Sequence, residues 1–87
     1  MKPVSKIRID KWLWAVRIFK TRTISTDACN SGKVKIDGKN IKPSRNIKLN
    51  EKITVQKGMI KFIYEVTGLI DKRVSAKIAS ENLKDLT

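Results

Sequence analysis

Hydrophobic residues near the start of the chain recur at the spacing of an amphipathic helix. One broad apolar stripe runs through residues 9–19, with polar and basic side chains beside it. The pattern predicts a helix from Ile9 to Phe19, with Asp10 as the N-cap that accepts the first free backbone N–H groups. The stripe that should pack into the core consists of Trp12, Leu13, Val16 and Phe19.

A second, shorter helix is predicted directly after the first. Thr21 or Thr23 can cap its start, and Ile24 and Ala28, which are four residues apart, should form its inner face. Gly32 is a suitable stop because glycine readily adopts the left-handed backbone that ends many helices. The link is so short that the two helices must turn sharply against each other.

The hydrophobic period changes after Gly32, from that of a helix to that of a strand. Val34 and Ile36 alternate with polar residues and should face inward, and Asp37-Gly38 predicts a tight hairpin turn with a return strand over 39–42. After the hairpin, Ile47 and Leu49 should lie in the core, and Asn50-Glu51 can form a turn. Further strands are predicted through Ile53 and Val55 and over residues 60–66. A C-terminal helix is predicted from about Ser75, and the side chains on one side of it are Ile78, Ala79, Leu83 and Leu86.

These elements predict one small α+β domain, in which two N-terminal helices pack on a small antiparallel sheet and a short C-terminal helix completes the fold. Within it we expect a flexible lead at 1–6, a core module at 7–57, and the last strand and helix at 58–87. The chain has 87 residues, which leaves no room for a separate catalytic domain.

Charge adds the first indication of function. The formal net charge is +12, and residues 1–45 carry +9 of it, from twelve basic and three acidic side chains. Such a surface attracts a polyanion, and the first half of the chain should form the contact. The ten candidate contact residues are Arg8, Lys11, Arg17, Lys20 and Arg22 from the helices, and Lys33, Lys35, Lys39, Lys42 and Arg45 from the hairpin and its exit.

Each functional interpretation has a structural alternative. The lysines can form a merely solvated surface, Arg22 can pair with Asp27 or cap backbone carbonyls, and Trp14 can pack in the core instead of stacking on a base. Arg17 and Arg22 are singled out because a guanidinium can grip phosphate with two parallel hydrogen bonds.

Other chemistries find little support in the sequence. There is no histidine, and Cys29 stands alone without a base to activate it. We expect no catalytic residue, no cofactor and no metal. No apolar run approaches the roughly 20 residues of a membrane span, and no signal-peptide core is seen, so a soluble, cytoplasmic protein is expected. We also expect a monomer.

Two stretches, R-I-D-K-W-L-W-A-V-R-I-F-K-T-R-T from Arg8 and G-K-V-K-I-D-G-K-N-I-K-P-S from Gly32, resemble the S4-like RNA-binding domain over about residues 7–57. Within it they are most similar to the bacterial group of the fifteen-kilodalton heat-shock protein and the ribosome-quality-control factor RqcP. The turn usually reads Asn-Gly where this chain has Asp37-Gly38, a customary glycine is absent near Asn50, and the long basic C-terminal tail of the heat-shock members is not present.

The resemblance implies a specific role. The partner would be a large ribosomal subunit that carries peptidyl-tRNA, and the protein would contact ribosomal RNA and tRNA during rescue or quality control of stalled nascent chains. The family's RNA-contact positions correspond to Arg8, Lys11, Arg17, Lys20 and Arg22, and more loosely to Lys33, Lys35 and Lys39. The alternatives are a ribosome-assembly or tRNA-binding factor without a role in stalling, part of an RNA-modifying enzyme, and a membrane-surface protein.

Overall fold

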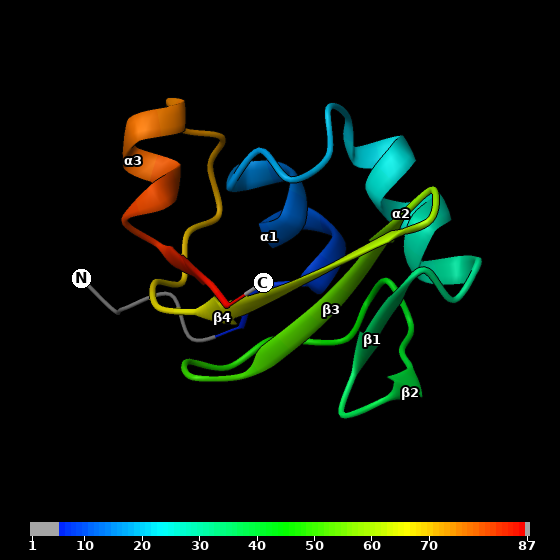
Figure 1. Cartoon of the computed structure of the whole chain (residues 1–87). Coiled ribbons are helices and arrows are strands. Elements are labelled where there is room, and N and C mark those ends of the chain that lie inside the picture. The colour runs from blue at the N-terminus through cyan, green and yellow to red at the C-terminus, as the bar shows by residue number, and fades with distance from the viewer. Residues whose placement is uncertain (1–5, 87) are drawn as a thin grey trace.

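The computed structural model describes residues 6–86, so most of the expected lead, and Thr87, lie outside the described residues. Within the described residues, three helices lie on one side of a five-stranded antiparallel sheet, in the strand order β2-β1-β3-β4-β5 (Figure 1). The elements are α1 (Ile9–Ala15), α2 (Arg22–Asn30), β1 (Val34–Ile36), β2 (Lys39–Asn40), β3 (Lys52–Lys57), β4 (Ile60–Val66), α3 (Ala76–Ser80) and β5 (Leu83–Asp85). The predicted α+β class is confirmed.

The β1–β2 hairpin forms at the predicted turn. Asp37 and Gly38 both have positive φ, 55° and 75°, which matches the twist of a two-residue hairpin loop. Val34 lies opposite Val55 and Ile36 lies opposite Ile53, and all four side chains are buried under the helices. The return strand is shorter than predicted, because only Lys39 and Asn40 of the range 39–42 pair with β1.

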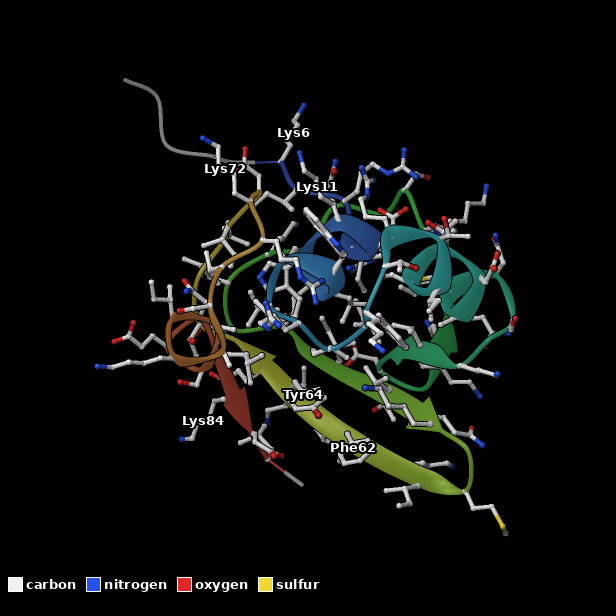
Figure 2. The ribbon with its side chains drawn as sticks, turned by 90° about the horizontal axis from the view of Figure 1, so that it is seen from above. Lys6, Lys11, Phe62, Tyr64, Lys72 and Lys84 are labelled. Carbon is white, nitrogen blue, oxygen red and sulfur yellow. The ribbon has the colours of Figure 1, made fainter. Side chains whose placement is uncertain are left out.

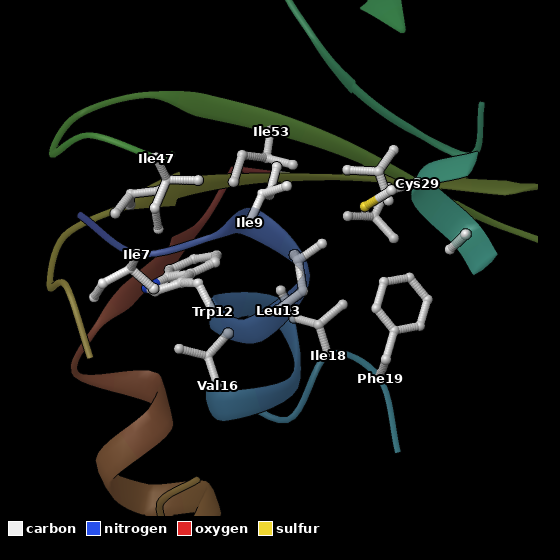
Figure 3. Close-up of a cluster of buried hydrophobic side chains, with 14 of the residues drawn as sticks. Ile7, Ile9, Trp12, Leu13, Val16, Ile18, Phe19, Cys29, Ile47 and Ile53 are labelled. Atoms are coloured by element: carbon white, nitrogen blue, oxygen red, sulfur yellow. The ribbon is translucent and has the colours of Figure 1, made fainter. Parts of the chain in front are cut away.

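The core lies between the helices and the sheet. The predicted stripe is buried, with Trp12 and Leu13 fully inaccessible, and Ile7, Ile9 and Ile47 pack beside it (Figure 3). The indole Nε1 of Trp12 donates a hydrogen bond of 2.8 Å to the carbonyl of Gly68, so the buried tryptophan also anchors the segment after β4.

The first helix ends earlier than the periodicity indicates. It stops at Ala15, and Arg17 adopts a left-handed backbone with a φ of 65°. The turn that follows still brings Ile18 and Phe19 into the core, so the apolar spacing is satisfied without helix. The N-cap prediction was wrong: Arg8 occupies that position without a side-chain cap bond, and Asp10 lies inside the first turn, buried.

The second helix confirms its predicted ends but not its inner face. The Thr21 hydroxyl accepts the backbone N–H of Ile24 at 3.1 Å, and Gly32 has a φ of 75° just past the helix. Ile24, however, is 47% exposed, and the buried face consists of Ser25, Ala28 and Cys29. Ser25 is tolerated there because its hydroxyl donates to the backbone carbonyl of Asp10 at 2.7 Å.

The C-terminal region departs most from the prediction. Helix α3, capped by Ser75, ends at Ser80, and residues 83–85 form strand β5 on the edge of β4 instead of continuing the helix. Leu83 and Leu86 therefore do not extend a helical face, and Ile78 is 46% exposed. Pairing with β4 also satisfies backbone groups along that edge of the sheet, which a longer helix would leave unpaired.

The predicted turn before β3 forms, with a consequence for its neighbour. Asn50 adopts a φ of 70°, as expected for the residue that replaces the customary glycine. Leu49, which was expected in the core, is 52% exposed beside this turn. That prediction was wrong because the chain turns directly after Ile47 and directs Leu49 outward.

Candidate nucleic-acid interface

A buried carboxylate joins the starts of the two N-terminal helices. Asp10 is 1% exposed and accepts two hydrogen bonds from Arg8, at 3.2 Å from Nε and 3.0 Å from Nη2. It also accepts from Nη2 of Arg22 at 3.5 Å and from the hydroxyl of Thr26 at 2.9 Å. We call this group, Asp10 with Arg8, Arg22 and Thr26, the arginine clamp.

The clamp fixes two cations at the surface. The side chains of Arg8 and Arg22 remain 50% and 43% exposed while Asp10 holds one side of each guanidinium. An arginine has five N–H donors, so donors remain free on both side chains for a phosphate or a base. Arg22 thus pairs with a carboxylate as the structural alternative proposed, but its partner is Asp10 and not Asp27.

The candidate lysines differ in exposure and in the side of the molecule on which they lie. Lys20, Lys33, Lys39 and Lys42 are exposed, whereas Lys11 and Lys35 are partly buried. Lys35 points to the sheet face away from the helices, because its neighbours in β1 face the core. Figure 2 places Lys11 at one edge of the molecule together with Lys6 and Lys72. Neither Lys6 nor Lys72 is among the ten predicted contact residues.

A hollow of about 530 Å³ lies beside the β1–β2 hairpin. Its walls bring together Lys39, Lys42 and Arg45, with Asp37 as the carboxylate in the same lining. The hairpin and its exit therefore gather three of the predicted contact residues around one concave surface.

Arg17 and Arg45 are placed differently from the clamp. Arg17 follows the end of α1 and donates to the carbonyl of Val74 at 3.3 Å, on the side of the C-terminal segment. Arg45 forms two hydrogen bonds with Glu51, at 3.2 and 2.8 Å. The hydrogen bond from Arg45 lowers the pKa of Glu51 below its usual value, and the same bond raises the pKa of Arg45. Arg45 thereby fixes the loop before β3.

Arg73 is a structural cation that sequence reasoning missed. Its Nη1 donates to the carbonyls of Trp14 and Phe19, at 3.0 and 3.2 Å, and its guanidinium lies 5.7 Å from the Trp14 ring centroid. Trp14 is therefore partly buried, and it lies against Arg73 in the segment before α3. Separations of 54 and 59 residues gave the sequence no local signal for these contacts.

The remaining reactive group is poorly suited to chemistry. Burial, with a smaller contribution from the charge of Asp10, raises the pKa of the Cys29 thiol to about 12, so it stays protonated near neutral pH. Within residues 6–86, no group of three or more carboxylate or cysteine side chains is arranged to hold a metal ion. In the same range, no helix is long and apolar enough to cross a membrane.

Comparison with known proteins identifies the family. The S4 domain family model matches residues 7–53, which include all ten candidate contact residues. Heat shock protein 15 of Escherichia coli K12 is 35% identical over 79 residues, which are 91% of this chain but 59% of that protein. The RQC P-site tRNA stabilizing factor of Helicobacter pylori J99 is 40% identical over 63 residues, which are 72% of this chain and 73% of that protein.

The fold is also found among solved structures. The trimeric structure of Vibrio cholerae heat shock protein 15 superposes with a TM-score of 0.88 at 31% identity, over 93% of this chain and 82% of that one. The chain spans about 59% of the length of the heat shock protein 15 relatives from Escherichia coli. The family model, the Helicobacter pylori relative and the shared fold agree with one another. This chain belongs to the S4 domain family.

Proposed function

We propose that this chain is an RNA-binding protein that recognises ribosomal RNA of the large subunit carrying peptidyl-tRNA. The contact surface is the arginine clamp with Lys11, Lys20, Lys33, Lys39 and Lys42, and it leaves out Lys35, which lies on the opposite face of the sheet. The protein acts by binding, without catalysis, in rescue or quality control of ribosomes with stalled nascent chains. It works in the cytoplasm and as a monomer.

The arginine clamp is the observation that carries the proposal. A merely solvated basic surface needs no buried partner, because free lysines and arginines are stable in water without one. Here a carboxylate that is 1% exposed holds two arginines that are about half exposed. Burying a carboxylate has a cost, and the arrangement gives two guanidinium groups a fixed spacing that can match a phosphate backbone.

The relatives support the finer role. One group is named for stabilising P-site tRNA, and the matched region covers 73% of the Helicobacter pylori protein. In this chain, the exposed cations run from Arg8, just before α1, through the turn between α1 and α2 to the hairpin, a surface broad enough for RNA segments that lie side by side. Shape and backbone recognition of this kind suits folded RNA, whose deep groove hides its base edges.

Gradient sedimentation of a cell lysate tests the role. At low and moderate salt, the protein should peak with free large subunits that also carry tRNA. A peak on precursor particles or with free tRNA would exclude the stalling role and favour an assembly or tRNA-binding factor. Absence from every RNA-containing fraction would exclude RNA binding itself.

A matched pair of variants tests the surface. Arg22→Gln removes a clamp cation, whereas Lys61→Gln removes the same charge from the sheet face away from the helices. Arg22→Gln should weaken RNA affinity by roughly 1–3 kcal/mol, and Lys61→Gln should change it far less. Equal effects would mean that net charge, and not the clamp, governs binding.

A further inference from the structure

Strand β4 carries two aromatic rings on the sheet face that elsewhere packs against the helices. Tyr64 lies opposite Ile53 and Phe62 opposite Val55, so both rings share the face of those buried residues. Their planes differ by 11°, and their centroids are 6.1 Å apart. In the view from the helix side, Figure 2 shows both rings on the sheet beyond the helices. Both side chains are partly exposed, and Tyr64 also packs against the edge of the core. The core face of the sheet thus continues into a partly exposed aromatic surface.

A groove borders this surface. It has a volume of about 290 Å³ and lies between Tyr64 of β4, Val16 and Ile18 of the turn after α1, and Ala79 of α3. Among the described residues, its lining includes two cations, Arg17 and Lys57, and no carboxylate. We call the groove together with Phe62 the aromatic groove.

The two cations are fixed at the groove by contacts of their own. Arg17 is fixed by its left-handed backbone and by its bond to the carbonyl of Val74. Lys57 donates to the carbonyl of Ile18, and its ammonium lies 5.2 Å from the ring centroid of Phe19. Both charges therefore remain beside an aromatic, largely apolar floor.

An acidic group lies opposite Tyr64 on the neighbouring strand. Asp85 of β5 stands opposite Tyr64, and burial together with this charge raises the pKa of the tyrosine. The phenol therefore stays neutral at physiological pH and presents an uncharged ring. One carboxylate against two cations leaves the rim positive.

We propose that the aromatic groove is a second RNA-contact site, which stacks unpaired bases on Tyr64 and Phe62 while Arg17 and Lys57 neutralise the adjoining phosphates. The proposal rests on the RNA-binding function proposed above. Flat rings flanked by cations match a nucleotide, which combines a π-face with a negative charge, and exposed sheet aromatics stack bases in other RNA-binding folds. A second copy of this chain is a poor occupant, since its net charge is also +12.

The second site lies away from the edge that carries Lys11. In Figure 2, Lys11 is at one edge of the molecule, and Phe62 and Tyr64 are towards the opposite edge. A paired RNA segment at the clamp and an unpaired segment at the groove can therefore be bound at once. The placement also gives Arg17 a role separate from the clamp, although the sequence analysis had singled out Arg17 and Arg22 together.

An NMR titration tests the site on the wild-type chain. The probes are a five-nucleotide oligoadenylate, which is unpaired, and a blunt RNA duplex without unpaired bases. The oligoadenylate should shift the ring protons of Phe62 and Tyr64, and the duplex should shift Arg8, Lys11 and Arg22. Oligoadenylate shifts confined to the clamp residues would overturn the proposal without any variant.

Variants then measure how much the two rings contribute to oligoadenylate affinity. Phe62→Leu with Tyr64→Leu removes both rings but keeps apolar bulk, and Ile63→Leu is a matched control on the other face of β4. The double variant should bind the oligoadenylate roughly tenfold more weakly, with duplex affinity unchanged. If the double variant fails to fold by circular dichroism, Tyr64→Leu alone replaces it. A folded variant with undiminished oligoadenylate affinity would overturn the proposal.

Two further outcomes distinguish failure of the aromatic groove from failure of the proposed RNA-binding function. If neither RNA binds, the proposed function fails; if only the duplex binds, the clamp stands and the aromatic groove alone is rejected. Sedimentation equilibrium tests whether a second copy of the chain occupies the groove instead. Self-association of the wild type that the ring substitutions abolish, with oligoadenylate binding unchanged, would assign the groove to a second copy and overturn the proposal.

Discussion

At the scale of single residues, Asp10 gives the sharpest test of the clamp. Asp10→Asn raises the net charge by one, so a surface that binds through total charge should bind RNA more tightly. The clamp predicts the opposite, because Arg8 and Arg22 lose the carboxylate that fixes them. We expect weaker RNA affinity and a loss of about 1–3 kcal/mol in the free energy of unfolding, measured by urea denaturation.

Asp37→Asn is the matched control for that substitution. It removes the same charge from the exposed hairpin turn, and asparagine tolerates the positive φ of this position. Its RNA affinity should equal or exceed that of the wild type. If the two variants bind equally well, the clamp has no role in positioning the arginines.

Glu51 predicts part of the acid dependence of stability. Its pKa is lowered, first by the hydrogen bond from Arg45, so the ionised carboxylate stabilises the folded state. This contribution is complete above the unfolded-state pKa of about 4.3 and is lost as the pH falls through the lower folded-state pKa. Glu51→Gln should therefore be less stable than the wild type near neutral pH, with a difference that shrinks in acid. Urea melts of both proteins across this range measure it, and a constant difference would refute the assignment.

Residue identities alone indicated the candidate cations but not their partners. Residue spacing predicted Asp10 as a helix cap and Asp27 as a partner for Arg22, whereas Asp10 instead pairs with both Arg8 and Arg22. The true pairing depends on how α2 packs on α1, where Ser25 reaches the Asp10 carbonyl and Thr26 its carboxylate. Such contacts follow from tertiary packing, which residue spacing does not encode.

At the scale of elements, Arg73 joins the C-terminal segment to the turn between α1 and α2. Arg73→Gln should destabilise the protein by about 1–3 kcal/mol, because the Trp14 and Phe19 carbonyls lose their charged donor. Lys72→Gln removes the same charge from an exposed neighbour and should change stability little. Urea denaturation followed by tryptophan fluorescence compares the two, and equal stabilities would show that Arg73 is dispensable to the fold.

Hydrophobic periodicity predicted which side chains are buried better than it predicted where helices end. Val16 and Phe19 are buried as expected, although Arg17 takes a left-handed backbone and the helix stops at Ala15. The C-terminal region failed for a related reason. Its leucines fit a helical spacing, but the open edge of β4 captured residues 83–85 as a strand, and no local pattern reports a distant free edge.

At the scale of the whole molecule, alternation predicted which side of β1 is buried, and turn residues predicted two of the turns that connect the sheet. The hairpin at Asp37-Gly38 and the left-handed Asn50 turn formed where the sequence indicated. The aromatic groove was not foreseen, because it needs β4, α3 and the turn after α1 to meet. These segments lie far apart in sequence, and only the closed fold brings their side chains to one surface.

The distribution of charge makes a final prediction about RNA binding as a whole. If the basic face neutralises several phosphates, the logarithm of affinity should fall against the logarithm of salt concentration with a slope of about −4 to −8. Arg22→Gln should make that slope shallower by about 1, because one phosphate contact is lost, and Lys61→Gln should leave it unchanged. Fluorescence anisotropy with a duplex RNA over a range of salt concentrations measures all three slopes. Neutralising phosphates always releases counterions, so binding through the basic face must depend on salt. A wild-type slope near zero would therefore mean that the basic face does not hold the RNA.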